Sequence, residues 1–250
     1  MVEGGNVVGT ALEILAASPP PERGAPAPGP AVDLEALYVA PEADLACPDL
    51  LARAKQAGVP VHRLAPGVLQ RVADTVTPQP VLAVARWHPP ALAGLAGADL
   101  VVVGVDVRDP GNAGTLLRSA EAAGAQGVVF CRGSVDVTNP KTVRASAGAL
   151  FHVPVVEGGD PQEVLSVLGD LGLMRIGAVV RGGERPDRVD LTRPVALVFG
   201  NEASGLPGPV TEALDGTVTI PMSGRAESLN LGMSASILLY EARRQRGAGS

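Results

Sequence analysis

The chain has 250 residues, a net charge of −6, 46% hydrophobic residues and only 18% charged residues. This composition supports a buried core and excludes a disordered protein, and without an apolar run of ~18 residues we expect no transmembrane helix. Two distant cysteines, Cys47 and Cys131, exclude a disulfide scaffold, and the start at Met1 lacks a basic signal segment, so we expect a cytoplasmic protein. The acidic balance by itself argues against a nucleic-acid partner.

The first third of the chain predicts a small α/β unit that ends where Trp87 and His88 are followed by two prolines. We therefore place a domain at residues 1–86, a linker at 87–98 and a second domain at 99–250. In the first domain we expect helices over 7–16 and 50–57, a loop over 22–30, and strands over 37–39, 59–64 and 81–85.

From residue 99 the sequence alternates between short β-branched runs and helical segments. Such alternation predicts a parallel sheet, in which ligands bind beyond the carboxyl ends of the strands. Functional side chains are therefore expected in the loops that follow strands. We expect strands over 101–107, 127–131, 153–156, 175–180, 195–199 and 218–221, and helices over 115–123, 161–171 and 231–244.

Three of these loops have unusual compositions. In the first, Asn112 is expected to cap a helix that begins at Ala113, with Arg118 on the face opposite the apolar residues. If this loop has no catalytic role, it is simply a capped helix on which Arg118 pairs with Glu121.

The second loop follows a buried strand and contains Gly200, Glu202 and Gly205; its simpler interpretation is a turn with a solvated carboxylate. The third runs from Ile220 to Asn230, which is expected to cap a helix rich in small residues. Helix capping and tight packing alone could account for that segment.

Together the three loops resemble, in order and spacing, the motifs of the SpoU (TrmH-like) family of RNA ribose 2′-O-methyltransferases in the SPOUT superfamily. The resemblance covers residues 99–246 and is closest to the ribosomal-RNA branch. The first family motif, N-x-G-x-x-x-R, matches Asn112 and Arg118, and the second, G-x-E-x-x-G, matches Gly200, Glu202 and Gly205. The third motif, I-P-M-x-G-x-x-x-S-L-N, matches Ile220, Pro221, Met222, Gly224, Ser228, Leu229 and Asn230.

The resemblance implies an α/β fold whose parallel sheet ends in a deep C-terminal trefoil knot, with a smaller N-terminal L30e-like α/β domain that binds RNA. It also implies a homodimer formed through the knotted domain. Relatives begin with a Lys/Arg-rich helix, so we expect the amino-terminal domain to be abbreviated and RNA binding to be modest. S-adenosylmethionine would be held by Phe199, Gly200, Gly205, Ile220, Met222, Ser228 and Leu229.

The implied reaction is methyl transfer to a ribose 2′-hydroxyl of RNA, with 23S ribosomal RNA as the expected substrate. Because a guanidinium resists deprotonation, we expect Arg118 to stabilise the alkoxide or to anchor a phosphate rather than to act as a base. The remaining catalytic candidates are Asn112, Glu202, Ser228 and Asn230, and the candidates for RNA contact are Lys141, Arg144 and Arg108. These basic residues would supply local charge in spite of the acidic total.

Several alternatives stay open from the sequence. The substrate could be transfer RNA, or the protein could be a catalytically silent RNA- or ribosome-binding protein. A nucleotide-binding enzyme of another type is also conceivable, although the chain has no P-loop signature. Lys141 and Arg144 could form a basic surface turn without contacting RNA. We expect no metal site, because His62, His88 and His152 form no ligand cluster, and we expect no aromatic platform for unstacked bases.

Overall fold

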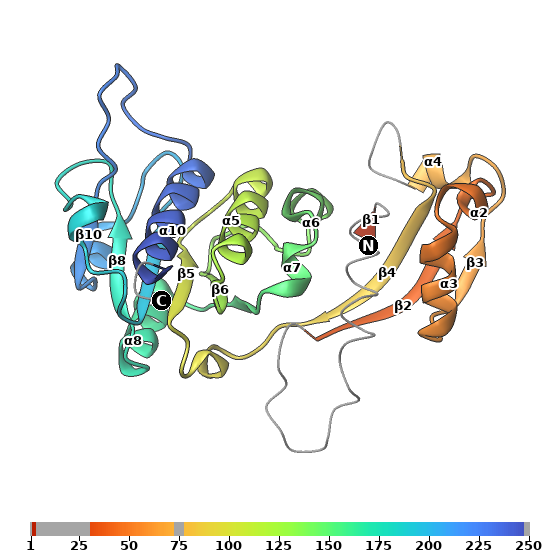
Figure 1. The fold of residues 1–250 in the computed structure, drawn as a ribbon, viewed down its shortest axis with the longest axis horizontal. Helices are drawn as coiled ribbons and strands as arrows, with labels where there is room; N and C mark the ends of the chain where they lie inside the picture. The colour runs from red at the N-terminus through yellow and green to blue at the C-terminus, as the bar shows by residue number, and fades with distance from the viewer. Residues whose placement is uncertain (1, 4–30, 73–77, 248–250) are drawn as a thin grey trace.

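The computed structural model describes residues 2–3, 31–72 and 78–247, and these form two separate sheets (Figure 1). The smaller sheet has four strands in the order β1-β4-β2-β3, with β2 and β3 parallel and the other pairs antiparallel. The helix and the loop that we expected over 7–16 and 22–30 lie outside the described residues. The elements of this half are β1 (Val2–Glu3), β2 (Ala31–Val39), α2 (Ala43–Ala46), α3 (Pro48–Gln56), β3 (Val61–Arg63), α4 (Val68–Val72) and β4 (Val81–His88).

Strands β2 and β4 are longer than the sequence pattern predicted. They pair from Ala31 with His88 to Val39 with Val81, with a bulge near Glu35. Trp87 and His88 therefore belong to the end of β4, although we had assigned them to the linker, because cross-strand hydrogen bonds carry the strand past the apolar run. The domain boundaries themselves remain a prediction.

The larger sheet has six strands in the order β10-β8-β9-β5-β6-β7, and all of its pairs are parallel. Each of the six strands that we expected is present, so the predicted parallel sheet is confirmed. All six carboxyl ends therefore lie at one edge, where ligands bind in such folds. The strands are β5 (Leu100–Gly104), β6 (Gly127–Phe130), β7 (Val155–Glu157), β8 (Met174–Ala178), β9 (Val195–Phe199) and β10 (Gly216–Val218).

Helices cover both faces of this sheet. Because side chains alternate along a strand, Val102 and Leu197 pack on the side of α5 and α10, whereas Val101 and Val198 pack on the side of α8 and α9. In the described residues, no helix is long and apolar enough to cross a membrane. The helical segments are η1 (Leu92–Leu95), α5 (Pro110–Ala122), α6 (Pro140–Ser146), α7 (Ala149–His152), α8 (Pro161–Asp170), η2 (Pro186–Arg188), α9 (Gly208–Glu212) and α10 (Leu231–Gly247).

Several strand boundaries differ from the predicted ones, and three of these differences have clear local reasons. Strand β5 ends at Gly104 rather than at residue 107, because the chain turns at Asp106, which has a φ of +55°. Strand β7 begins only at Val155, since the residues before Val153 form α7. Strand β10 covers 216–218 instead of 218–221, because its pairing with β8 starts at Gly216.

Helix α10 is tied to the preceding chain through Gln245, whose side chain also contacts Glu241 of the same helix. The Glu241 carboxylate accepts hydrogen bonds from Arg244 at 2.7 Å and from Gln245 at 2.9 Å. The Gln245 amide also donates to the backbone oxygens of Pro186 and Val189. The bonds from Arg244 and then Gln245 lower the pKa of Glu241 from about 4.5 to about 2.

We expect Glu241→Gln to reduce the free energy of unfolding at pH 7 by about 1 kcal/mol, because it removes a charged acceptor. The depressed pKa means that this contribution is complete above pH 4.5 and is lost as the pH falls toward 2. Urea unfolding of both proteins at pH 7, 4.5 and 3 measures the difference. A difference that does not narrow as the pH falls would contradict this role of the carboxylate.

Candidate functional site

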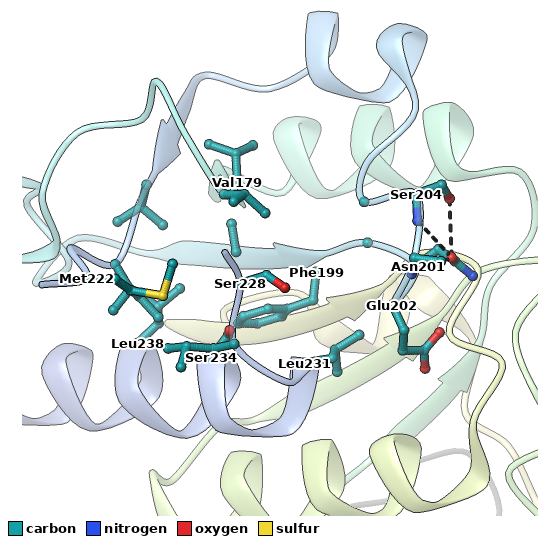
Figure 2. Close-up of a pocket in the computed structure, with 18 residues that line it drawn as sticks. Val179, Phe199, Asn201, Glu202, Ser204, Met222, Ser228, Leu231, Ser234 and Leu238 are labelled. Atoms are coloured by element: carbon teal, nitrogen blue, oxygen red, sulfur yellow. Dashed lines mark hydrogen bonds between the residues drawn. The ribbon is translucent and has the colours of Figure 1, made fainter. Parts of the chain in front are cut away.

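A cavity of about 240 Å³ opens beyond the carboxyl ends of β8, β9 and β10, beside the start of α10 (Figure 2). Its walls combine apolar side chains such as Val179 and Leu238 with the hydroxyls of Ser204, Ser228 and Ser234. Seven of its lining residues are those that we predicted for the cofactor: Phe199, Gly200, Gly205, Ile220, Met222, Ser228 and Leu229.

The loop after β9 is unusually tight. Asn201 and Gly205 exchange two backbone hydrogen bonds of 3.0 and 2.9 Å, and Gly205 has a φ of +68°. A Cβ on Gly200 would lie 2.3 Å from the carbonyl carbon of Gly205 and 2.4 Å from its oxygen. Only glycine at position 200 therefore allows this close approach, which places backbone groups along the cavity.

Asn201 is a site residue that our sequence reasoning missed. Its Oδ1 accepts hydrogen bonds from the backbone N–H groups of Ala203 and Ser204, and its Nδ2 donates to the Asp106 backbone oxygen at 2.9 Å. The sequence did contain a signal for this residue. Asn201 directly follows a buried strand and lies between two glycines, and asparagine side chains stabilise such turns by hydrogen bonds to the backbone.

Three of the predicted catalytic residues form one hydrogen-bonded chain. Asn230 Nδ2 donates to Asn112 Oδ1 at 2.8 Å, and Asn112 Nδ2 donates to Glu202 Oε1 at 3.1 Å. The hydrogen-bond partners fix the orientation of the Asn230 and Asn112 side-chain amides. Asn230 Oδ1 already accepts from the backbone N–H groups of Gly232 and Met233. Its nitrogen must then face Asn112, whose own nitrogen must face the carboxylate.

The two predicted helix caps have different outcomes. Asn230 caps α10 as predicted, because its Oδ1 accepts from Gly232 N–H at 2.9 Å. The predicted cap at Asn112 is wrong. Helix α5 begins at Pro110, and Asp109 is its N-cap, accepting from the Asn112 backbone N–H at 2.8 Å. An Asp-Pro pair suits the cap and first position of a helix, and it frees the Asn112 side chain for Glu202.

Glu202 lies where the loops after β5 and β9 meet. Its carboxylate accepts from the Asn112 side chain and from the backbone N–H groups of Asp109 at 3.2 Å and Arg108 at 3.4 Å. Partial burial acts to raise the pKa of Glu202, but the hydrogen bonds from Asn112 and the backbone outweigh it and leave the pKa below its usual value. The group is therefore an anion at neutral pH that holds these loops together.

Arg118 does not line this cavity. It is exposed on α5, six residues and about 9 Å of helix rise beyond Asn112, and it lines a second cavity of about 640 Å³ with Tyr240 and Arg243 of α10. Glu121 would pair with Arg118 if the loop had no catalytic role, but its Oε1 instead shares a hydrogen bond with His152 Nδ1. The two helices approach closely here, with Ser119 and Ser236 Oγ atoms 2.7 Å apart.

The three predicted RNA-contact residues lie on two elements. Arg108 follows β5 and its side chain is 73% exposed, whereas Lys141 is exposed at the start of α6 and Arg144 is half-buried near the end of that helix. Asn139 caps α6 by accepting from the Lys141 backbone N–H at 2.9 Å. Among the described residues, no group of three or more His, Cys, Asp or Glu side chains is placed to hold a metal ion.

Comparison with known proteins matches residues 99–240 to the model of the SpoU rRNA Methylase family. The chain is 35% identical over 188 residues to the 23S rRNA (guanosine(2553)-2′-O)-methyltransferase RlmP of Bacillus subtilis, covering 75% of this chain and 74% of that protein. It is 37% identical over 202 residues to the 23S rRNA (guanosine-2′-O-)-methyltransferase RlmB of Xanthomonas axonopodis, covering 78% of this chain and 81% of that protein.

The fold is similar to the crystal structure of the SpoU methyltransferase AviRb from Streptomyces viridochromogenes in complex with the cofactor AdoMet. The TM-score is 0.81 at 29% sequence identity, over 99% of this chain and 90% of that one.

Proposed function

Because the chain belongs to the SpoU rRNA Methylase family, we propose that it transfers a methyl group from S-adenosylmethionine to a ribose 2′-hydroxyl of 23S ribosomal RNA. The observation that carries this proposal is the position of the three family motifs. Seven residues of the second and third motifs line one cavity. At the edge of this cavity, the hydrogen bonds from Asn230 to Asn112 and from Asn112 to Glu202 join all three motifs. The relatives RlmP and RlmB are 23S rRNA methyltransferases by name, which favours ribosomal over transfer RNA.

The cavity suits S-adenosylmethionine by its chemistry. Apolar side chains, including Phe199, Ile220 and Leu238, can cover a flat adenine, and the Ser228 and Ser234 hydroxyls can pair with its polar groups. The Gly200–Gly205 loop brings backbone donors and acceptors to the wall, and the Glu202 anion favours a positively charged ligand. When bound, the cofactor supplies a methyl group on a sulfonium ion.

The protein's own residues would orient the ribose and stabilise charge. Within the described residues, the Asn112 and Asn230 amides each use one N–H in the chain to Glu202, which leaves one N–H on each for a substrate oxygen. Loss of the hydroxyl proton to water creates negative charge on the 2′-oxygen, which the Arg118 guanidinium stabilises. Ser228 completes the rim of the site, and Lys141, Arg144 and Arg108 contact RNA phosphates.

A homodimer would explain why Arg118 lies away from the cavity in one chain. Three apolar residues of α10, namely Met233, Ile237 and Tyr240, are 56, 41 and 71% exposed and share one face through their spacing of four and three residues. Tyr240 also lines the second cavity beside Arg118. This face lies on the domain in which the trefoil knot is predicted. We propose that it packs against a second copy of the chain and brings Arg118 to the partner's site.

We expect Ile237→Asp to convert the dimer into monomers in analytical ultracentrifugation, because it places a charge in the apolar face. Methyl transfer should fall by at least tenfold, whereas the affinity for S-adenosylmethionine should change little, since the cavity is built from one chain. Leu45→Asp is the matched control, because Leu45 is 92% exposed on α2, in the half of the chain that forms the smaller sheet. A variant that stays dimeric and active would contradict this interface.

Mapping of 2′-O-methylated nucleotides tests the function directly. Ribosomal and transfer RNA from cells with and without the gene should differ at a nucleotide of 23S RNA, and purified protein should restore that methyl group from labelled S-adenosylmethionine. A change confined to transfer RNA would identify a different substrate. Unchanged methylation of both RNAs, with no transfer by the purified protein, would indicate a binding protein instead of an enzyme.

A further inference from the structure

The turn after β5 contains a residue in a rare backbone conformation. Asp106 has a φ of +55°, and among the described residues the other non-glycine with a positive φ is Ala147. This conformation is unfavourable for most side chains and persists where surrounding contacts hold it. The contacts of Asp106 therefore indicate what the conformation is for.

Two other loops at the same sheet edge position the Asp106 carboxylate. Asn201, after β9, donates its Nδ2 to the Asp106 backbone oxygen at 2.9 Å and to Oδ2 at 3.3 Å. Gly133, after β6, leaves the space that the carboxylate needs, since a Cβ there would lie 2.9 Å from Asp106 Oδ1. The carboxylate thus has a defined position at the ends of three adjacent strands.

Asp106 in turn holds Arg108. Arg108 Nε donates to Asp106 Oδ1 at 2.9 Å, and within the described part of the chain no hydrogen bond engages the two terminal nitrogens of this guanidinium. The backbone N–H of Arg108 donates to Glu202, which lines the cofactor cavity. The free edge of the guanidinium is the planar fork that binds phosphate with two parallel hydrogen bonds.

We propose that Asp106 and Asn201 are positioning residues that orient Arg108 to bind an RNA phosphate beside the cavity. This inference rests on the proposed function, which supplies RNA as the substrate. Charge alone gives the opposite expectation, because a carboxylate at an RNA-binding turn repels phosphate. The Asp106 carboxylate helps in another way, because it orders the long, 73% exposed side chain of Arg108 before RNA binds. Without it, binding would have to restrict the rotamers of this side chain, at a cost in conformational entropy.

Whether Asp106→Asn weakens or strengthens RNA binding separates the ordering of Arg108 from charge repulsion. Asp106→Asn removes the charge but keeps the shape, and asparagine tolerates a positive φ. In filter binding to unmodified 23S RNA transcribed in vitro, we expect its affinity to fall about three- to tenfold with an unchanged salt slope, because the number of phosphate contacts is the same. Arg108→Ala should weaken binding further and reduce the salt slope by about one. The double variant should bind like Arg108→Ala alone.

Asp187→Asn is the matched control, because Arg185 Nε donates to Asp187 Oδ1 at the same 2.9 Å, again between two exposed residues, at the start of η2. Loss of that carboxylate should leave RNA affinity unchanged or slightly higher. Asp106→Gly, which relieves the backbone conformation, should fold at least as well as the wild type and still lose affinity.

The inference is overturned if Asp106→Asn binds RNA as tightly as the wild type or more tightly, or if its effect persists in the Arg108→Ala background. Labelling of the same transcript by the wild type tests the proposed function separately. RNA binding without transfer of a labelled methyl group would contradict the proposed function. The RNA affinities of the two single variants and the double variant would still decide the role of Asp106.

Discussion

Arg118→Ala is expected to lower methyl transfer to 23S RNA by about 10²- to 10³-fold, the usual cost of removing one donor that stabilises charge in the transition state. Arg118 is exposed on α5 and outside the candidate cofactor cavity, so calorimetric affinity for S-adenosylmethionine and thermal stability should change little. A loss confined to kcat would match a contact made only in the transition state.

Two further variants test the role of Arg118. Arg118→Lys keeps the charge but not the planar fork, so it should recover part of the activity if charge on the 2′-oxygen matters and little if a bidentate phosphate contact matters. Arg188→Ala, at another exposed arginine, is the control and should stay active. Undiminished transfer by Arg118→Ala would refute its assigned role.

Gly200→Ala is expected to have the second large effect. The added Cβ would lie within 2.5 Å of three backbone atoms of Gly205 and Leu206, which cannot move without opening the loop after β9. We expect a loss of about 1–3 kcal/mol in the free energy of unfolding, as for other overpacked sites. Affinity for S-adenosylmethionine, measured by calorimetry, should fall more than tenfold because the loop forms one wall of the cavity.

Controls separate the effect on binding from an effect on folding. Gly208→Ala should be neutral, because apart from its chain neighbours and its own helix backbone nothing lies within 4 Å of the position of its Cβ. Leu229→Arg inserts a long cation into the same cavity at a half-buried position and should abolish cofactor binding without unfolding the protein. Unchanged affinity in both Gly200→Ala and Leu229→Arg would show that the cofactor binds elsewhere.

The sequence by itself determined the parallel sheet and the location of the candidate site. Buried strands such as β5 and β9 consist of continuous apolar runs, which are local signals. Once the strands are parallel, the loops that follow them must share one edge. For this reason the loops that contain Gly200 and Leu229 were expected at one edge of the sheet. The resemblance to the SpoU family then assigned both loops to one cofactor site, and both line the same cavity.

Only the tertiary structure decided which side chains pair within that site. The hydrogen bonds from Asn112 to Glu202 and from Asn201 to Asp106 join residues 90 and 95 positions apart, and they depend on β9 lying next to β5. Strand order is set by how apolar faces pack, which no local pattern encodes. The same packing separates Arg118 from the candidate cofactor cavity and places Asp106, an ordinary aspartate in the sequence, against Asn201.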